Sequence, residues 1–187
     1  MRVVLASGSP RRRELLAREG VEFEVIPSPA EEIGPDEAPW DELCERNAVL
    51  KARAVPVAGA WVIGADTLVQ VGGRVLGKPR DMDEARAMLR ALSGREHEVR
   101  TGVCVIDPEG REHSFQEITR VRFRELDEAA IDDYFARVNP LDKAGAYGIQ
   151  EQGDRIVEGI DGDFDNVVGL PVRRLVEWLR ACGSAGL

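Results

Sequence analysis

The chain has 187 residues, which suits one domain of ordinary size. Its formal net charge of −9 at pH 7 argues against binding to nucleic acid polymers, whose phosphates attract basic surfaces. Its three cysteines are odd in number and widely spaced, and no apolar run is long enough to span a membrane. These features predict a cytoplasmic protein with no disulfide framework, no zinc site and no membrane partner.

The first half of the chain alternates short apolar strands with helices. Strands are predicted over 2–6, 21–26 and 61–65, and helices over 11–18 and 40–54. The third strand ends at Asp66 and Thr67, and a hairpin is expected next, over 68–76.

The second half begins with a capping box, Asp81-x-x-Glu84, in front of a helical apolar stripe that ends at Leu92. The pattern then predicts strands over 97–106 and 112–123, and helical stripes over 131–138 and 172–179. Between those stripes, a glycine-rich segment is expected to hold short strands over 146–150 and 155–160. The tail, 183–187, is expected to be loose. This order of elements predicts an α/β or α+β fold around a mixed sheet.

Three consecutive arginines follow Ser7-Gly-Ser-Pro10 at the start of the first helix. Ser9 is a natural N-cap and Pro10 a natural first helical residue. The positive end of the helix dipole disfavours arginines at 11–13 unless an anion binds there, so the motif indicates a phosphate site. The alternative is a solvated basic turn that pairs with Glu14 or with more distant carboxylates.

Asp66 and Thr67 stand where an apolar strand is expected to end. Ligands of open α/β sheets gather at such ends, and an aspartate there can hold a metal or activate water. Taken alone, this aspartate is better explained as the cap of a turn.

The segment Gly72-x-x-x-x-Gly77-Lys78-Pro79 resembles a Walker A loop but fails as one. Proline replaces the hydroxyl residue that would bind Mg²⁺, and a hairpin surrounds the segment instead of a strand-to-helix turn. Lys78 nevertheless remains a candidate phosphate contact. With Lys51 and Lys143 it is one of only three lysines against 22 arginines, and all three lie in stretches that are candidates for function.

The glycine-rich stretch Asp142-Lys-Ala-Gly-Ala-Tyr-Gly-Ile-Gln150 offers small residues around an amide that can read the polar edge of a base. Composition alone does not separate this from a plain glycine-rich loop. His97 and His113 have no partner at metal-ligand spacing and are expected to be surface strand residues.

These stretches together resemble the Maf family along nearly the whole chain. The matching blocks are Leu5-Ala-Ser-Gly-Ser-Pro-Arg-Arg12, Gly64-Ala-Asp-Thr67, Gly77-Lys-Pro-Arg80, Leu92-Ser-Gly94, Asp142 to Gln150, and Val167-Val-Gly-Leu-Pro171. The resemblance implies one Maf-like domain over 1–187, with two lobes around a mixed sheet, an ITPase/Maf-like fold and a central cleft for the nucleotide. It also implies a homodimer.

The resemblance further implies hydrolysis of a nucleoside triphosphate at the α-phosphate, assisted by a divalent metal such as Mg²⁺ or Mn²⁺. By the same resemblance, Asp66 is the general base and Glu32 with Asp66 holds the metal. The implied specificity positions are Arg11, Thr67 and Gln150. The implied phosphate contacts are Ser7, Arg12, Lys51 and Lys78.

Asp-Thr at 66–67 with Ile-Gln at 149–150 is similar to the family branch that takes dTTP and UTP. Glu151 stands where the family often has glycine, a departure that leaves the course of the loop after Gln150 open. Two other functions remain: a non-catalytic nucleotide-binding regulator of cell-division arrest, and a broad house-cleaning pyrophosphatase for damaged or purine triphosphates. A panel of nucleoside triphosphates with pyrophosphate detection separates them.

Overall fold

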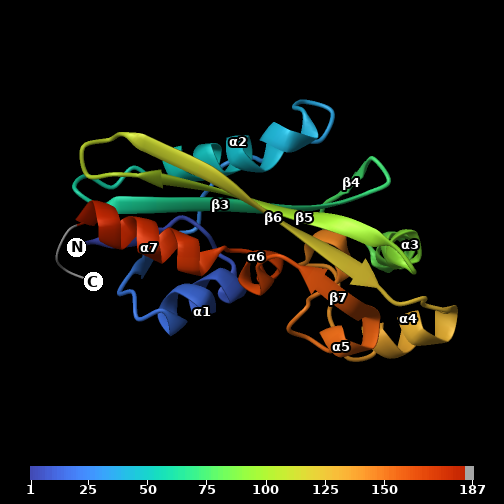
Figure 1. Ribbon diagram of the computed structural model, residues 1–187. Helices are drawn as coiled ribbons and strands as arrows, with labels where there is room; N and C mark the ends of the chain where they lie inside the picture. Colours follow the sequence, from blue (N-terminus) through green and yellow to red (C-terminus); the bar gives the residue numbers. More distant parts are fainter. Residues whose placement is uncertain (184–187) are drawn as a thin grey trace. The chain divides into compact units, whose positions relative to one another are not determined.

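Seven strands form one mixed sheet in the order β2-β1-β3-β5-β6-β7, with β4 paired to β3 (Figure 1). The computed structural model describes residues 1–183. The strands are β1 (Val3–Leu5), β2 (Glu24–Val25), β3 (Trp61–Val71), β4 (Arg74–Leu76), β5 (Glu96–Ile106), β6 (Glu112–Phe123) and β7 (Val157–Asp161). β1 pairs in parallel with β2 and β3, whereas β3 pairs antiparallel with β4, and β6 with β7. The predicted mixed α/β class is confirmed.

Helices occupy the connections between the strands. They are α1 (Pro10–Arg18), α2 (Trp40–Arg53), α3 (Met82–Leu92), α4 (Glu128–Phe135), the 3₁₀ helix η1 (Ala144–Ala146), α5 (Gly153–Ile156), α6 (Phe164–Val168) and α7 (Val172–Gly183). The hydroxyl of Ser9 accepts from the Arg12 amide and Pro10 opens α1, as predicted. The Asp81 carboxylate caps α3 in the same way. Over residues 1–183, no helix has the length and apolar character needed to cross a membrane.

The chain divides into two compact units, and β3, β5 and β6 each contribute residues to both. Unit 1 comprises Met1–Thr67, Thr101–Glu117 and the residues from Gly169 onward, and unit 2 comprises Leu68–Arg100 and Ile118–Val168. Each unit is described by itself below. The two-lobed single domain with a central cleft stays a prediction.

In unit 1, helix α2 lies against the sheet with almost no space between backbones. A β-carbon at Gly64 of β3 would lie 2.2 Å from the carbonyl oxygen of Ala48, and one at Gly102 of β5 would lie 2.4 Å from that of Cys44. Only glycine allows a helix backbone to come this close to a strand. α2 covers one face of the sheet here, and α1 and α7 lie on the opposite face (Figure 1).

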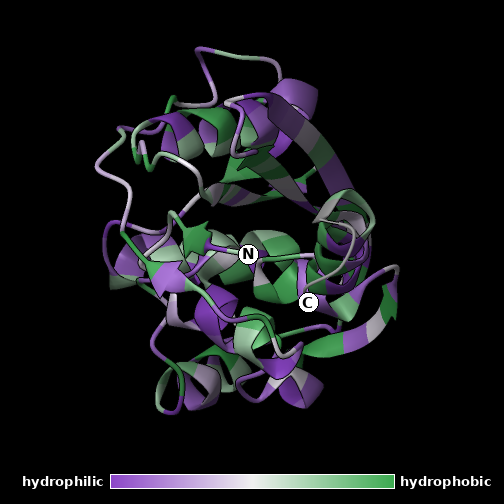
Figure 2. Ribbon diagram, turned by 90° about the vertical axis from the view of Figure 1, so that its left-hand side faces the viewer, coloured by the Kyte–Doolittle hydropathy of each residue, from purple (hydrophilic) through white to green (hydrophobic). Residues whose placement is uncertain are grey.

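Hydrophobic and hydrophilic residues both occur along the helices of the structure (Figure 2). Under α2, a buried apolar cluster joins β1, β3 and β5 to the helix; its members are Val4, Ala6, Ala48, Ala52, Val55, Ala60, Val62 and Cys104. On α7, the predicted stripe is buried, and Trp178 packs edge-on against Trp61 of β3 with ring centroids 5.9 Å apart. Cys44 and Cys104 are buried, Cys182 is exposed, and none forms a disulfide.

In unit 2, helix α3 buries the apolar stripe predicted for it, Ala85, Met88, Leu89 and Leu92. This helix packs against η1. Helix α4 buries Ile131 and Tyr134, and the exposed Gly72-Gly73 turn joins β3 to β4 as the hairpin predicted. These contacts place Gly145 and Ala146 of η1 in the interior of the unit.

The structure corrects three expectations about strands. The strand predicted over 146–150 is absent: η1 and a turn occupy this segment, with Gly145 and Ala146 both at positive φ, which a strand does not allow. The strand predicted over 155–160 begins only at Val157, behind α5. Asp66 and Thr67 lie inside the eleven-residue strand β3 and not at its end. The predicted loose tail after Gly183 lies outside the described residues.

Gly64→Ala is expected to lower the free energy of unfolding by about 1–3 kcal/mol, because the new methyl group overlaps the backbone of α2 and the helix must shift. Urea denaturation followed by circular dichroism measures this. Gly77→Ala is the matched control, since a β-carbon there has no atom within 4 Å, and it should change stability by less than about 0.5 kcal/mol. Equal midpoints for the two variants would contradict the close approach of α2.

Candidate functional site

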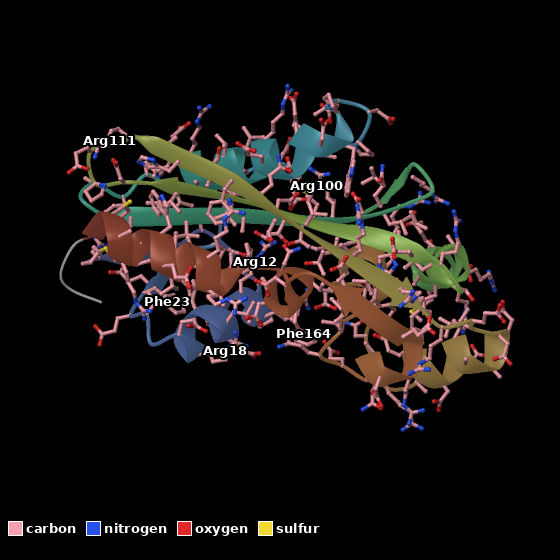
Figure 3. All side chains as sticks on the ribbon, viewed as in Figure 1. Arg12, Arg18, Phe23, Arg100, Arg111 and Phe164 are labelled. Carbon is pink, nitrogen blue, oxygen red and sulfur yellow. The ribbon has the colours of Figure 1, made fainter. Side chains whose placement is uncertain are left out.

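Arg12, the third residue of helix α1, is buried and donates to four acceptors of unit 1 (Figure 3). Its Nε lies 2.7 Å from the Gly169 carbonyl oxygen, Nη1 lies 2.8 Å from that of Ala65 and 3.2 Å from the Ser7 hydroxyl, and Nη2 lies 3.0 Å from the Thr67 hydroxyl. Burial lowers the pKa of this guanidinium, against an opposing effect of the nearby Asp66 carboxylate. Four of its five N–H groups are thus used to join three segments of unit 1.

The neighbouring arginines behave differently. Arg11 is half-buried and Arg13 is exposed on the first turn of α1. The alternative of a solvated basic turn does not describe Arg12, which is buried and whose partners among the described residues are carbonyl and hydroxyl oxygens. Its role as a phosphate contact, like that of Ser7, therefore stays a prediction, and its structural role is established.

Thr67 of β3 belongs to the same network. Its hydroxyl accepts from Arg12, lies 2.9 Å from the Thr101 hydroxyl and donates weakly to the Gly169 carbonyl oxygen at 3.3 Å. Thr101 of β5 is fully buried and was not singled out in the sequence, because a threonine in a strand looks like any β-branched strand residue. The network fixes the rotamer of Thr67, a predicted specificity position.

Asp66 is 4% exposed, and both its oxygens are held by helix α2. Lys51 Nζ lies 2.6 Å from Oδ1, and Asn47 Nδ2 lies 3.2 Å from Oδ2. Asn47 and Lys51 are one helical turn apart, so their side chains descend from the same face of α2. The three residues form a charge-assisted hydrogen-bond network in the interior of unit 1.

Asn47 also fixes the loop that precedes α2. Its Oδ1 accepts from the Ile33 amide at 2.9 Å, and its Nδ2 donates to the Ile33 carbonyl at 3.2 Å. Beside Ile33, Glu32 Oε1 lies 2.6 Å from Lys51 Nζ. Asn47 was not singled out in the sequence; the signal that identifies it is an amide among small and apolar residues on the buried face of a helix.

Lys51 Nζ therefore stands between two carboxylates, those of Asp66 and Glu32, at 2.6 Å from each. Carboxylates that converge on one cation position suit Mg²⁺ or Mn²⁺, which prefer oxygen ligands. Over the described residues there is no group of three or more His, Cys, Asp or Glu side chains arranged for a metal. Two carboxylates fit a metal that takes its remaining ligands from water and substrate phosphates, a common arrangement for Mg²⁺.

In unit 2, the structure brings the loops of Lys78 and Gln150 together. The Gly145 amide donates to the Gly77 carbonyl oxygen at 3.0 Å, and both Lys78 and Gln150 are exposed. The nine predicted site residues thus fall into two groups and a flanking residue. Ser7, Arg12, Thr67, Lys51, Asp66 and Glu32 share contacts in unit 1, with Arg11 beside them on α1, whereas Lys78 and Gln150 lie on neighbouring loops of unit 2.

Gln150 lies in a turn that begins at Gly148, whose carbonyl oxygen accepts from the Glu151 amide at 3.0 Å. The Tyr134 hydroxyl accepts from the Gly148 amide at 3.0 Å and lies 3.3 Å from its carbonyl oxygen. Lys143 is buried and donates to the Asn139 carbonyl and to the carboxylates of Asp142 and Glu151, at 2.8, 2.8 and 3.0 Å. Lys143 is therefore a structural lysine, and Glu151 closes the loop by an ion pair.

His97 is not the surface residue expected from the sequence. It is 2% exposed, and its Nε2 lies 2.8 Å from the Tyr147 hydroxyl. Burial lowers the pKa of His97 to about 4 and raises the pKa of the Tyr147 phenol, so both are neutral at pH 7. The start of β5 alternates regularly, and His97 lies on the buried face together with Val99 and Thr101, a pattern that the sequence interpretation overlooked. His113, by contrast, is partly exposed and faces Asp107.

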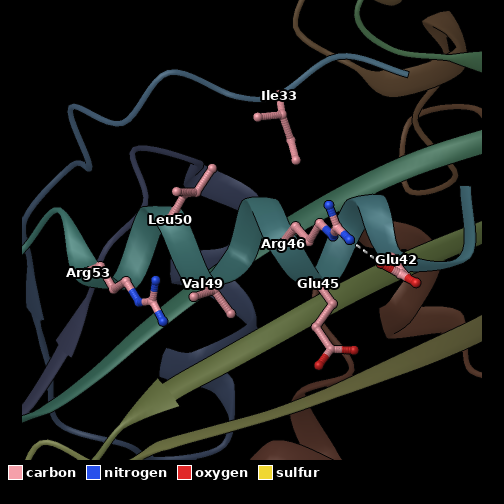
Figure 4. Close-up of a pocket in the computed structure, with 7 residues that line it drawn as sticks. All are labelled: Ile33, Glu42, Glu45, Arg46, Val49, Leu50 and Arg53. Atoms are coloured by element: carbon pink, nitrogen blue, oxygen red, sulfur yellow. Dashed lines mark hydrogen bonds and ion pairs between the residues drawn. The ribbon is translucent and has the colours of Figure 1, made fainter. Parts of the chain in front are cut away.

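A pocket of about 530 Å³ opens along α2, and Asp66 is not among the residues that line it (Figure 4). It is lined by Ile33, Glu42, Glu45, Arg46, Val49, Leu50 and Arg53. Its two arginines are already paired, Arg46 with Glu42 at 2.5 Å and Arg53 with Glu112 at 2.6 Å. With its positive charges neutralised and its floor apolar, the pocket does not suit a triphosphate.

Comparison with known proteins assigns the chain to a family. The model of the Maf-like protein family matches residues 2–182. The chain belongs to the Maf family. Three relatives are each named dTTP/UTP pyrophosphatase: one from Anaeromyxobacter dehalogenans, 51% identical over 97% of this chain and 94% of its own length; one from Akkermansia muciniphila, 48% identical over 97% and 96%; and one from Bacillus cereus, 49% identical over 96% and 94%.

Among solved structures, the chain is similar to a nucleoside-triphosphatase, also named dITP/XTP pyrophosphatase, from Mycobacterium abscessus. The match has a TM-score of 0.46 and 19% identity, and covers 98% of this chain and 95% of the other. At this TM-score the similarity decides nothing further, and the fold class rests on the strand order itself.

Arg12→Lys is expected to lower the free energy of unfolding by about 1–3 kcal/mol. A lysine ammonium cannot reach the carbonyls of Gly169 and Ala65 together, and at least one buried acceptor loses its partner. Arg13→Lys, on the exposed side of the same turn, is the control and should leave stability unchanged. Should both variants unfold at the same urea concentration as the parent, the structural role of Arg12 is wrong.

Proposed function

We propose that the protein hydrolyses dTTP and UTP to the nucleoside monophosphate and pyrophosphate. The observation that carries the proposal is the buried Asp66, held by Lys51 and Asn47, in a chain about half identical to relatives of that name over nearly its whole length. A triphosphate substrate agrees with the cytoplasmic location predicted from the sequence. The homodimer implied by the family resemblance stays a prediction.

Asp66 is the proposed general base. The two hydrogen bonds from α2 fix the plane of its carboxylate, so that it can orient a water molecule toward the α-phosphorus for in-line attack. In the structure, its Oδ1 is engaged by Lys51, an ammonium that it shares with Glu32. A triphosphate competes for this ammonium, and transfer of Lys51 to a phosphate oxygen leaves Oδ1 available to accept the proton of the water.

Positive charge for the substrate is proposed to come from Lys51 and the remaining N–H of Arg12 in unit 1. Lys78 of unit 2 stays a predicted phosphate contact. A divalent metal held by Glu32 and Asp66 would neutralise charge that develops on the pyrophosphate leaving group. Lysine is suited to this task because its compact ammonium exchanges readily between carboxylate and phosphate oxygens.

Base choice is assigned to Gln150 in unit 2. Its amide presents one donor and one acceptor, which match the N3–H and carbonyl edge shared by uracil and thymine. Cytosine presents an acceptor at N3 and a donor at N4, so an amide in the same orientation is mismatched. The match between the amide and the uracil and thymine edge favours a pyrimidine-specific enzyme over a broad house-cleaning enzyme. Against a non-catalytic regulator stands the buried, oriented Asp66, for which binding alone offers no purpose.

Asp66→Asn is expected to lower the rate of pyrophosphate release by about 10²–10⁴-fold, because the amide keeps the shape of the carboxylate but accepts no proton. Steady-state assays with UTP and Mg²⁺ or Mn²⁺ measure the rate, and calorimetry with a non-hydrolysable UTP analogue measures affinity. Asp107→Asn is a control of the same chemical change at a buried carboxylate of a distant turn, and it should keep its activity. Near-parental turnover by Asp66→Asn rules out the general base.

The parent enzyme should cleave dTTP and UTP well, and ATP, GTP and unmodified CTP poorly. Gln150→Ala should lower the rate and also narrow the difference in rate between UTP and CTP, because the amide that distinguishes their base edges is gone. This loss of discrimination corresponds to about 1–3 kcal/mol. A panel of the five triphosphates with pyrophosphate detection makes the comparison. Equal cleavage of ATP and UTP by the parent would refute the pyrimidine assignment and leave a general pyrophosphatase.

A further inference from the structure

The turn that carries Gln150 is anchored on its N-terminal side by a buried polar pair. Tyr147 immediately precedes Gly148, the first residue of the turn, and its hydroxyl lies 2.8 Å from His97 Nε2. Both side chains are almost completely buried. No other hydrogen bond of the Tyr147 side chain competes with this one among the contacts of the described residues.

The pair is also confined by ring packing. The rings of His97, Tyr147 and Phe123 meet edge to face, with centroids 4.9 Å apart for His97 and Phe123, 4.8 Å for Phe123 and Tyr147, and 5.5 Å for His97 and Tyr147. His97 Nδ1 is buried and has no hydrogen-bond partner in the described part of the chain. Burial of a polar imidazole in an aromatic cluster costs free energy unless the ring makes hydrogen bonds. The hydrogen bond of the His97 ring goes to Tyr147, the residue before the Gln150 turn.

We propose that His97 is a positioning residue for base recognition, which acts through the Tyr147 hydroxyl to fix the direction in which the turn presents Gln150. The proposal rests on the function proposed above, and it adds two residues to the specificity machinery. His97 lies on β5, so the hydrogen bond ties the turn to the sheet as well as to its own loop.

An amide distinguishes uracil from cytosine only if its orientation is fixed, because a rotated amide offers its donor and acceptor in the opposite order. The Ile149 side chain is buried and Glu151 is tied to Lys143, so the remaining freedom of the turn is a tilt about Gly148. Tyr134 holds the two backbone groups of Gly148, and the His97–Tyr147 bond holds the residue before it. Loss of that bond therefore allows the amide to tilt without unfolding the loop.

Tyr147→Phe is the sharpest test, because it removes the hydroxyl and keeps the ring that packs against Phe123. The ratio of kcat/KM for UTP to that for CTP is expected to fall about tenfold, mainly through a higher KM for UTP, with kcat for UTP within about threefold of the parent. His97→Gln should give a change in the same direction. In a Gln150→Ala background, Tyr147→Phe should no longer change the ratio.

Thr119→Val is the matched control in unit 2. Its buried hydroxyl donates to the Asp163 carbonyl and contacts Asn166, and has no contact with the Gln150 turn, so the variant should lose stability and keep the UTP to CTP ratio. Hydrogen exchange measured by mass spectrometry should show faster exchange at 148–151 in Tyr147→Phe but not in Thr119→Val.

The outcomes distinguish failure of the proposed function from failure of the positioning role alone. A parent enzyme that cleaves neither UTP nor dTTP overturns the proposed function, and the positioning role with it. A parent enzyme that cleaves UTP, together with a Tyr147→Phe variant that melts at lower temperature but keeps the parental UTP to CTP ratio, overturns the positioning role alone. A ratio that Tyr147→Phe still lowers in the Gln150→Ala background also overturns it, because the effect then bypasses Gln150.

Discussion

The close approach of helix α2 to strands β3 and β5 is the constraint on which the acid–lysine cluster depends. Because Gly64 and Gly102 carry no side chain, the backbone of α2 packs directly against β3 and β5, and the carbonyl oxygens of the helix set the distance between helix and sheet. At this depth the short Asn47 side chain reaches Asp66, and the same amide holds Ile33 and so places Glu32 beside Lys51. A small outward shift of α2 would break the Asn47 bond first and release the loop of Glu32 with it.

Two of the buried charges of unit 1, Asp66 and Arg12, are compensated in different ways. Asp66 is compensated by a full ammonium, Lys51, whereas Arg12 is compensated mainly by the dipoles of carbonyl and hydroxyl groups. An ion pair can be exchanged when a stronger anion arrives, but a guanidinium bound to backbone carbonyls is fixed by the fold. This difference separates a cation that can serve a substrate, Lys51, from one that mainly supports the surrounding segments, Arg12.

The elements with strong local signals were predictable. The Ser9–Pro10 start of α1, the capping box of α3 and the apolar stripes of α3 and α7 follow from spacing alone, and the structure confirms them. The role proposed for Asp66 came from the family resemblance; the sequence associated this residue with an apolar strand but put it at the end of the strand and not inside it. What could not be predicted is set by tertiary contacts: Asn47 and Thr101 acquire their roles from partners far along the chain.

The stretch 142–160 shows the same limit most clearly. Its small and apolar residues suggested a strand at 146–150, but Lys143, Tyr134 and His97 hold it as a helical turn and a loop. His97 looked like a surface residue because histidine is a polar residue type. The signal of its burial was the period of two that puts it on one face with Val99 and Thr101, whereas its hydrogen bond to Tyr147 depends on a tertiary contact.

The use of lysine in this arginine-rich chain has a chemical consequence. The Lys51 and Lys143 side chains are 12% and 5% exposed and each ammonium contacts two carboxylates, which limits the access of a reagent to its nitrogen, whereas Lys78 is exposed. Under mild conditions an acylating reagent is therefore expected to modify Lys78 and the amino terminus, and not the other two lysines. A ligand that covers Lys78 would shield the protein from modification at that position, so the reagent reports occupancy by nucleotide without any turnover.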